Sequence, residues 1–165
     1  MITIISGTNR IDSLTEKVSE VYRSILGKKN INAQIFSLKN VDVLHRNAAF
    51  LKIEKDILFP SQKFIFIIPE YNGTFPGVLK AMIDTSEIIK AWQGKKALLT
   101  GVSSGRAGNL RGLDHMAACL HYLKMNVHYN KLPISVINKI MDGKGNLDDA
   151  TLLAIHQQLD EFLNL

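Results

Sequence analysis

Short apolar segments alternate along the chain with longer stretches in which apolar residues recur every three or four positions. The short segments are continuously apolar or alternate with polar residues, which predicts strands. We expect strands at residues 1–6, 33–38, 63–68 and 96–102, with a fifth at 126–129. The periodic stretches predict helices. We expect helices at residues 14–25, 76–83, 109–124 and 147–163.

Residues typical of helix ends flank these stretches. Gly27 is placed to stop the first helix, Pro76 suits the first turn of the second, and Asp148 suits the N-cap of the last. No element is predicted at 39–62.

The alternation predicts a parallel sheet with helices on both faces, because parallel neighbours need a crossover connection, usually a helix. Five strands in 165 residues favour a flavodoxin-like three-layer α/β sandwich with a five-stranded parallel sheet, formed by a single domain over residues 1–165. Such sheets bind ligands at the carboxyl ends of their strands, near the point where strand order reverses. The loops expected there are 7–15, 69–76 and 102–109.

Composition narrows the setting and the partners. A net charge of +5 is scattered, and no basic run interleaves with aromatic residues, so we expect no nucleic-acid partner. No apolar run approaches the roughly 20 residues that span a bilayer, so no membrane association is expected. The first residues lack a positive region ahead of their apolar run and suit a strand better than a signal peptide. A single cysteine, Cys119, allows no intramolecular disulfide and indicates a reducing cytoplasm.

The first loop, SGTNRIDSLTEK at 6–17, joins a strand to a helix. Amides and the positive dipole end of that helix favour an anion such as phosphate. Thr8, Ser13 and Thr15 offer hydroxyl groups and Arg10 a fixed positive charge. The loop lacks the glycine patterns of triphosphate-binding and dinucleotide-binding loops, and it has no cysteine nucleophile. The alternative is that Ser13 or Asp12 only caps the helix.

The second loop, PEYNGTFP at 69–76, follows the most apolar strand. Glu70, Tyr71 and Asn72 are expected at the sheet edge with backbone N–H groups free for the edge of a planar ring. Aromatic side chains of the loop could shield that ring. The alternative is a simple turn with Gly73 at positive φ.

The third loop, GVSSGRAGNLRG at 101–112, combines glycines and serines in an open turn rich in N–H donors. It could close over the far end of a planar ring, with Arg106 or Arg111 adding charge. Glycine-rich turns are also common at strand ends without any ligand.

Metal and side-chain catalysis are not predicted. The five histidines form no close ligand pair, no Ser-His-Asp arrangement is present, and Leu147 stands where a calcium loop needs glycine. We therefore expect no catalytic side chain and no metal site, and a cofactor that carries the chemistry.

Together, GTNRIDS (7–13), PEYNGTFPGVLKAMID (69–84) and SSGRAGNLR (103–111) resemble the NAD(P)H-dependent FMN reductases of the flavodoxin-like superfamily. The resemblance implies non-covalent FMN and NAD(P)H as co-substrate. Hydride would pass through flavin N5 to a small-molecule acceptor such as a flavin, quinone, azo compound or metal oxyanion. It also implies a homodimer or homotetramer.

Carried over by position, the resemblance implies the residues of the cofactor site. The phosphate would be held by Thr8, Arg10, Ser13 and Thr15. The isoalloxazine ring would be lined by Pro69, Glu70, Tyr71 and Asn72, and its pyrimidine side bordered by Ser103, Ser104 and Gly105. The chain departs from the family pattern at Thr85-Ser86-Glu87.

Two other functions fit the same fold. One is a flavodoxin-type single-electron carrier without NAD(P)H activity; the basic charge and Arg10 favour the reductase over it. The other is a binding or regulatory protein that holds no flavin.

Overall fold

The computed structural model describes residues 1–165, and its centre is a parallel sheet in the order β2-β1-β3-β4-β5, with β6 also paired to β4. The order reverses between β1 and β3, because the chain first adds β2 on one side and then builds the other side. The predicted flavodoxin-like three-layer fold is confirmed. The strands are β1 (Ile2–Ser6), β2 (Ala33–Ser37), β3 (Lys63–Pro69), β4 (Lys96–Val102), β5 (Asn126–Val127) and β6 (Leu132–Ile134).

The fifth position of the sheet differs from its prediction. One strand was expected at 126–129, but β5 and β6 share the edge of β4 as two short pieces. The chain leaves the ladder in a tight turn, where the Lys131 amide donates to the Tyr129 carbonyl at 3.0 Å. The interruption divides the edge strand and leaves β6 beside the end of β4.

Helices connect the strands, and the four predicted helices are all present. None of the helices combines the length and the apolar character needed to cross a bilayer. The helical elements are α1 (Leu14–Lys28), α2 (Ala48–Ile53), the π-helix η1 (Glu54–Leu58), α3 (Gly77–Thr85), α4 (Ile88–Ala91), α5 (Leu110–Tyr122), α6 (Ile137–Ile140) and α7 (Asp149–Leu163).

Two of the three residues predicted to mark helix ends, Pro76 and Asp148, lie at the start of a helix. Asp148 caps α7 by accepting from the Thr151 amide at 2.8 Å, and Pro76 is the N-cap residue of α3. The prediction for Gly27 is wrong, since α1 continues through it to Lys28. Asn30, at φ 59°, takes the left-handed conformation that ends the helix instead.

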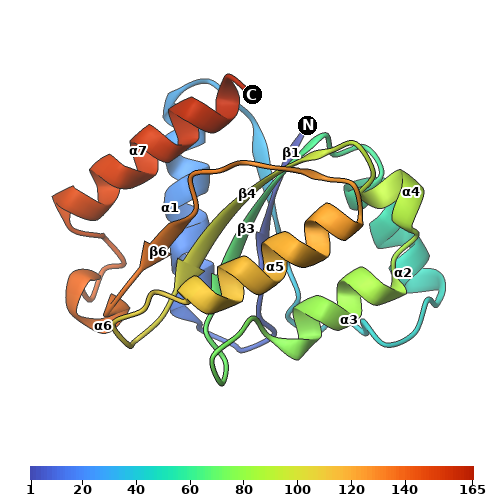
Figure 1. Ribbon diagram of the computed structural model, residues 1–165, viewed down its shortest axis with the longest axis horizontal. Coiled ribbons are helices and arrows are strands. Elements are labelled where there is room, and N and C mark those ends of the chain that lie inside the picture. The colour runs from blue at the N-terminus through green and yellow to red at the C-terminus, as the bar shows by residue number, and fades with distance from the viewer.

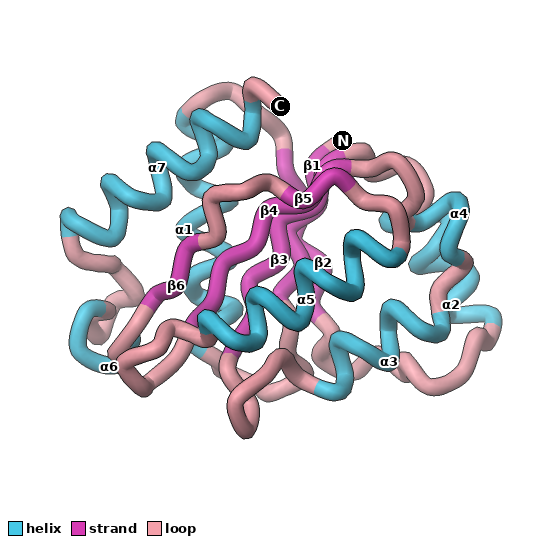
Figure 2. The backbone as a smooth tube through the Cα atoms, in the orientation of Figure 1, coloured by secondary structure: helices cyan, strands magenta, loops and turns pink.

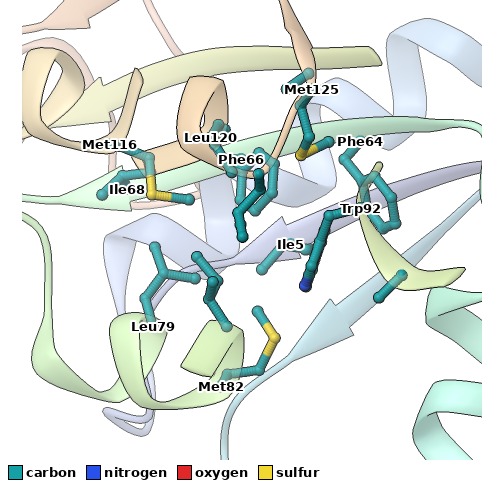
Figure 3. Close-up of a cluster of buried hydrophobic side chains, with 14 of the residues drawn as sticks. Ile5, Phe64, Phe66, Ile68, Leu79, Met82, Trp92, Met116, Leu120 and Met125 are labelled. Carbon is teal, nitrogen blue, oxygen red and sulfur yellow. The ribbon is translucent and has the colours of Figure 1, made fainter. Parts of the chain in front are cut away.

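Two hydrophobic cores separate the layers. Successive strand residues point to opposite faces, so Phe64 and Phe66 pack on the side of α3 and α5, while Ile65 and Ile67 pack on the side of α1 and α7. Figures 1 and 2 show these helix pairs on the two sides of the sheet. Figure 3 shows the first core, in which Trp92 lies against Phe64 with ring centroids 5.1 Å apart.

The stretch at 39–62, for which no element was predicted, is held by a buried carboxylate. Glu54 is fully buried, and its oxygens accept from the Arg46 guanidinium at 2.9 Å and from the Glu87 amide at 2.6 Å. Thr85 donates to the Val43 carbonyl at 2.6 Å. The segment that departs from the family pattern therefore anchors this stretch to α3 and α4.

Candidate flavin-binding site

A cavity of about 310 Å³ lies at the carboxyl ends of β1, β3 and β4, beside the reversal of strand order. All three predicted loops contribute to it, as expected for loops at one edge of a parallel sheet. The predicted residues that line it are Arg10, Ser13, Thr15, Pro69, Glu70, Tyr71, Ser103 and Ser104. Thr8, Asn72 and Gly105 do not line it: Thr8 is covered, and the other two are exposed on their turns.

The first loop leaves a row of unpaired donors at the start of α1. Ser13 caps the helix by accepting from the Glu16 amide at 3.1 Å. The backbone amides of residues 11–15 donate no hydrogen bond within the chain. The predicted helix cap and the predicted anion cradle are therefore both present, because capping uses one amide and leaves the others free.

The second loop is a tight turn. The Tyr71 amide donates to the Thr74 carbonyl at 2.9 Å and the Thr74 amide returns to the Tyr71 carbonyl at 3.2 Å. Asn72 and Gly73, between them, have φ values of 52° and 80°, as the central residues of a type I′ turn require. The prediction of a turn with Gly73 at positive φ is correct, and this turn presents Tyr71 to the cavity.

The expectation of free amides at the start of this loop is wrong. The Glu70 amide donates to the Val102 carbonyl at 3.0 Å, because the pairing of β3 with β4 continues one residue past Pro69. The Tyr71 amide is used by the turn. The amides of Asn72, Gly73 and Phe75 remain without an acceptor in the chain.

The third loop keeps its donors. The backbone amides of residues 104–109 donate no hydrogen bond within the chain. Ser103 is buried and its hydroxyl donates to the Gly105 carbonyl at 2.9 Å. Arg106 and Arg111 are exposed and do not line the cavity.

Sequence reasoning missed Asn109, which joins the second and third loops. It is buried at the N-cap of α5 with φ 64°, and its Nδ2 donates to the carbonyls of Ile68 and Pro69 at 3.0 and 3.1 Å. Gly112 leaves room for it, since a Cβ there would lie 2.1 Å from Asn109 Oδ1. The only signal available was an asparagine at the start of the helix predicted for 109–124.

Sequence reasoning also missed α6, which supplies Ile137 and Asn138 to the cavity wall. The Ile137 amide donates to the Ser103 carbonyl at 3.0 Å and the Val136 amide to the Gly105 carbonyl at 2.9 Å. Val136 adopts φ 45°, which is unfavourable for a β-branched residue. No local pattern marks this segment, because its partners lie about thirty residues earlier in the chain.

We expect Asn109→Ala to lower the free energy of unfolding by about 2 kcal/mol, because it removes two buried hydrogen bonds and puts alanine at positive φ. Asn109→Gly, which tolerates that φ, should lose less stability but the same two bonds. Chemical denaturation of both variants measures the difference. Equal losses would contradict a backbone contribution at this position.

The donor set fits flavin mononucleotide. A phosphate group needs N–H donors and positive charge, and the start of α1 offers the free amides of residues 11–15 with Arg10 beside them. A planar ring edged with carbonyl oxygens needs further donors, and the amide of Ser104 at the cavity wall is free. The fold and this donor set define a flavin-binding protein of the flavodoxin-like class.

Comparison with known proteins agrees with that class. The sequence profile of the family described as NADPH-dependent FMN reductase matches residues 1–136. The chain belongs to this family. The predicted enzyme class, an FMN-dependent NAD(P)H oxidoreductase, is confirmed and is favoured over the flavodoxin-type carrier.

Individual relatives carry related names. The chain is 34% identical over 99 residues to an NAD(P)H-dependent FMN reductase of Pseudomonas aeruginosa, an alignment that covers 58% of this chain and 54% of that protein. It is 26% identical over 172 residues to a quinone reductase of Pseudomonas putida, covering 98% of this chain and 91% of the relative.

A solved structure shows the same fold. The flavoenzyme NAD(P)H:(acceptor) oxidoreductase FerB from Paracoccus denitrificans superposes with a TM-score of 0.78 at 24% identity, covering 99% of this chain and 94% of that one.

Proposed function

We propose that the cavity at the ends of β1, β3 and β4 holds FMN and that NAD(P)H and an oxidised acceptor use the cofactor's open face in turn. The observation that carries this proposal is that the unpaired amides of residues 11–15 and the unpaired amide of Ser104 meet at one cavity. The amides of residues 11–15 suit an anion at a helix start, and the Ser104 amide suits the edge of a ring.

Each group of residues has a separate role in this proposal. The phosphate is held by the amides of residues 11–15, the Arg10 guanidinium and the hydroxyls of Ser13 and Thr15, while Thr8 supports this cradle from behind through the Arg10 amide. The ring lies against Pro69, Glu70 and Tyr71, beside the exposed Asn72, and its pyrimidine side faces Ser103 and Ser104, next to Gly105. FMN, when bound, supplies the two-electron chemistry.

The protein's contribution is position and electrostatics. The free amide of Ser104, at the cavity wall, stabilises negative charge at the ring edge without a proton transfer. Ser103 and Asn109 keep the third loop in place through side-chain hydrogen bonds to backbone carbonyls. No catalytic side chain is required in this scheme.

The acceptor is proposed to be a small molecule such as a flavin, quinone, azo compound or metal oxyanion. We further propose a single domain that works in the cytoplasm as a homodimer or homotetramer, without a nucleic-acid or membrane partner. A single cysteine suits a reducing compartment, and the positive charge is scattered rather than gathered in a basic run.

Anaerobic mixing of the FMN-loaded protein with NADH and then with NADPH tests the proposal. We expect at least one of them to bleach the yellow flavin absorbance, and a subsequent acceptor to restore it. A protein that accepts single electrons from dithionite and none from either nicotinamide would be a carrier. A purified protein that cannot be loaded with FMN would overturn the cofactor site itself.

We expect Arg10→Ala to weaken FMN binding by about 2 kcal/mol, roughly thirtyfold, because it removes a charge-assisted contact to the phosphate. Arg23→Ala is the matched control, since Arg23 lies on the exposed face of α1 in an ion pair with Glu20. Titration of each variant with FMN, followed by flavin fluorescence, gives both affinities. Wild-type affinity in Arg10→Ala would show that the phosphate lies elsewhere.

A further inference from the structure

Tyr71 belongs to the second loop, but its side chain reaches the first. The turn that holds its backbone is closed by two hydrogen bonds to Thr74. The Tyr71 hydroxyl shares a hydrogen bond of 2.5 Å with Thr8 Oγ1. The ring therefore bridges the loop after β3 and the loop after β1, at a sequence separation of 63 residues.

Thr8 is a rigid anchor for this bridge. It is 1% exposed, and its own amide donates to the Ser6 carbonyl at 2.8 Å. Its Oγ1 also accepts from the Arg10 amide at 3.2 Å. The same hydroxyl thus contacts both the Tyr71 side chain and the backbone of Arg10, which places these two residues in one unit.

The Arg10 guanidinium completes the unit. Its Cζ lies 4.1 Å from the centroid of the Tyr71 ring, a cation–π contact. Arg10 forms no ion pair with any carboxylate of the chain. A carboxylate partner would occupy the N–H donors and offset the charge, whereas an aromatic face orients the guanidinium and leaves its edge donors free for an anion.

We propose that Tyr71 is a positioning residue that holds the Arg10 guanidinium at the phosphate cradle and thereby sets the preference for FMN over riboflavin. Riboflavin has the same ring but no phosphate, so only FMN benefits from an oriented Arg10. This role differs from lining the ring, which affects both flavins equally. The inference rests on the proposed function, since it assumes that the cavity binds a flavin.

The test compares two ligands in equilibrium dialysis of the full chain, FMN and riboflavin. The measured quantity is the ratio of their dissociation constants. We expect Tyr71→Leu to reduce the preference for FMN about tenfold, because the cation–π contact and the Thr8 bond are both lost. Tyr71→Phe keeps the ring and should reduce it only about threefold. Tyr122→Leu, at a tyrosine that is 85% exposed on α5, is the control and should leave the ratio unchanged.

The Arg10→Ala background shows whether Tyr71 acts through Arg10. There, Tyr71→Leu should change the ratio no further, because the group that it positions is gone. Equal losses of FMN and riboflavin affinity in Tyr71→Leu would overturn the inference and leave Tyr71 as a ring contact. A wild-type chain that binds neither flavin would overturn the proposed function together with this inference.

Discussion

Gly101→Ala is expected to cost about 4 kcal/mol of unfolding free energy and to abolish flavin binding. Gly101 lies near the end of β4, and a Cβ there would lie 2.0 Å from the Gly108 carbonyl oxygen. That oxygen belongs to backbone and cannot rotate away as a flexible side chain would. Gly108 is itself confined, because a Cβ on it would lie 2.6 Å from Pro133. Relief of the clash must therefore displace the third loop.

Urea denaturation measures the stability change, and FMN titration measures the loss of the site. Gly27→Ala is the matched control: Gly27 lies inside α1, and nothing lies within 4 Å of the Cβ position. It should raise stability by about 0.5–1 kcal/mol, because alanine is the better helix former. Wild-type stability in Gly101→Ala would mean that the loop has room which the structure does not show.

The stability of the wild-type protein is expected to gain about 3 kcal/mol from Lys95 as pH rises from about 8 to 10.5. Lys95 is 7% exposed, and its Nζ donates to the carbonyls of Leu58 and Phe59 at 2.7 and 3.0 Å, with no carboxylate partner. Burial of this ammonium group lowers the pKa of Lys95 from 10.5 to about 8.

The sign follows from proton binding in the two states. Between these pKa values the unfolded chain keeps the proton and the folded protein has released it, so raising pH favours folding. Below pH 8 both states are charged, and the folded state bears the full cost of burying the charge. The free energy of unfolding therefore increases as the pH rises from about 8 to about 10.5.

A difference measurement isolates Lys95. The free energy of unfolding of the wild type and of Lys95→Met is measured at about pH 7 and about pH 10.5, so that groups common to both cancel. Between these pH values the free energy of unfolding should rise more in the wild type than in Lys95→Met. In Lys55→Met, at an exposed lysine of η1, it should change by the same amount as in the wild type. An equal change in Lys95→Met as well would contradict the lowered pKa of Lys95.

Local patterns predicted most elements because they depend on neighbours in the chain. The apolar run of β3 and the periodicity of α7 describe burial directly, and Asp148 caps its helix through a residue three positions away. The stretch at 39–62 resisted prediction because its folding depends on Glu54, whose partner Glu87 comes from another part of the chain.

The sequence predicted which loops form the site, but it predicted the hydrogen bonds of those loops less well. The carboxyl ends of parallel strands meet at one edge, so three unusual loops after three strands were expected to converge, and they line one cavity. The hydrogen-bond partners of the loop residues depend on the register of the strands. The register of β3 and β4 places the Glu70 amide beside the Val102 carbonyl, and it brings the Asn109 side chain against the end of β3.

By itself, the sequence determined the alternation of strands and helices, the order of the loops and the chemistry that each loop offers, since these depend on residues close together in the chain. Only the tertiary structure decided which amides remain free, and that α6 forms a wall of the cavity. It also decided that Tyr71 reaches Thr8 and Arg10. These contacts join segments 31 to 63 residues apart, and their geometry is set by strand register and turn conformation, which no local pattern contains.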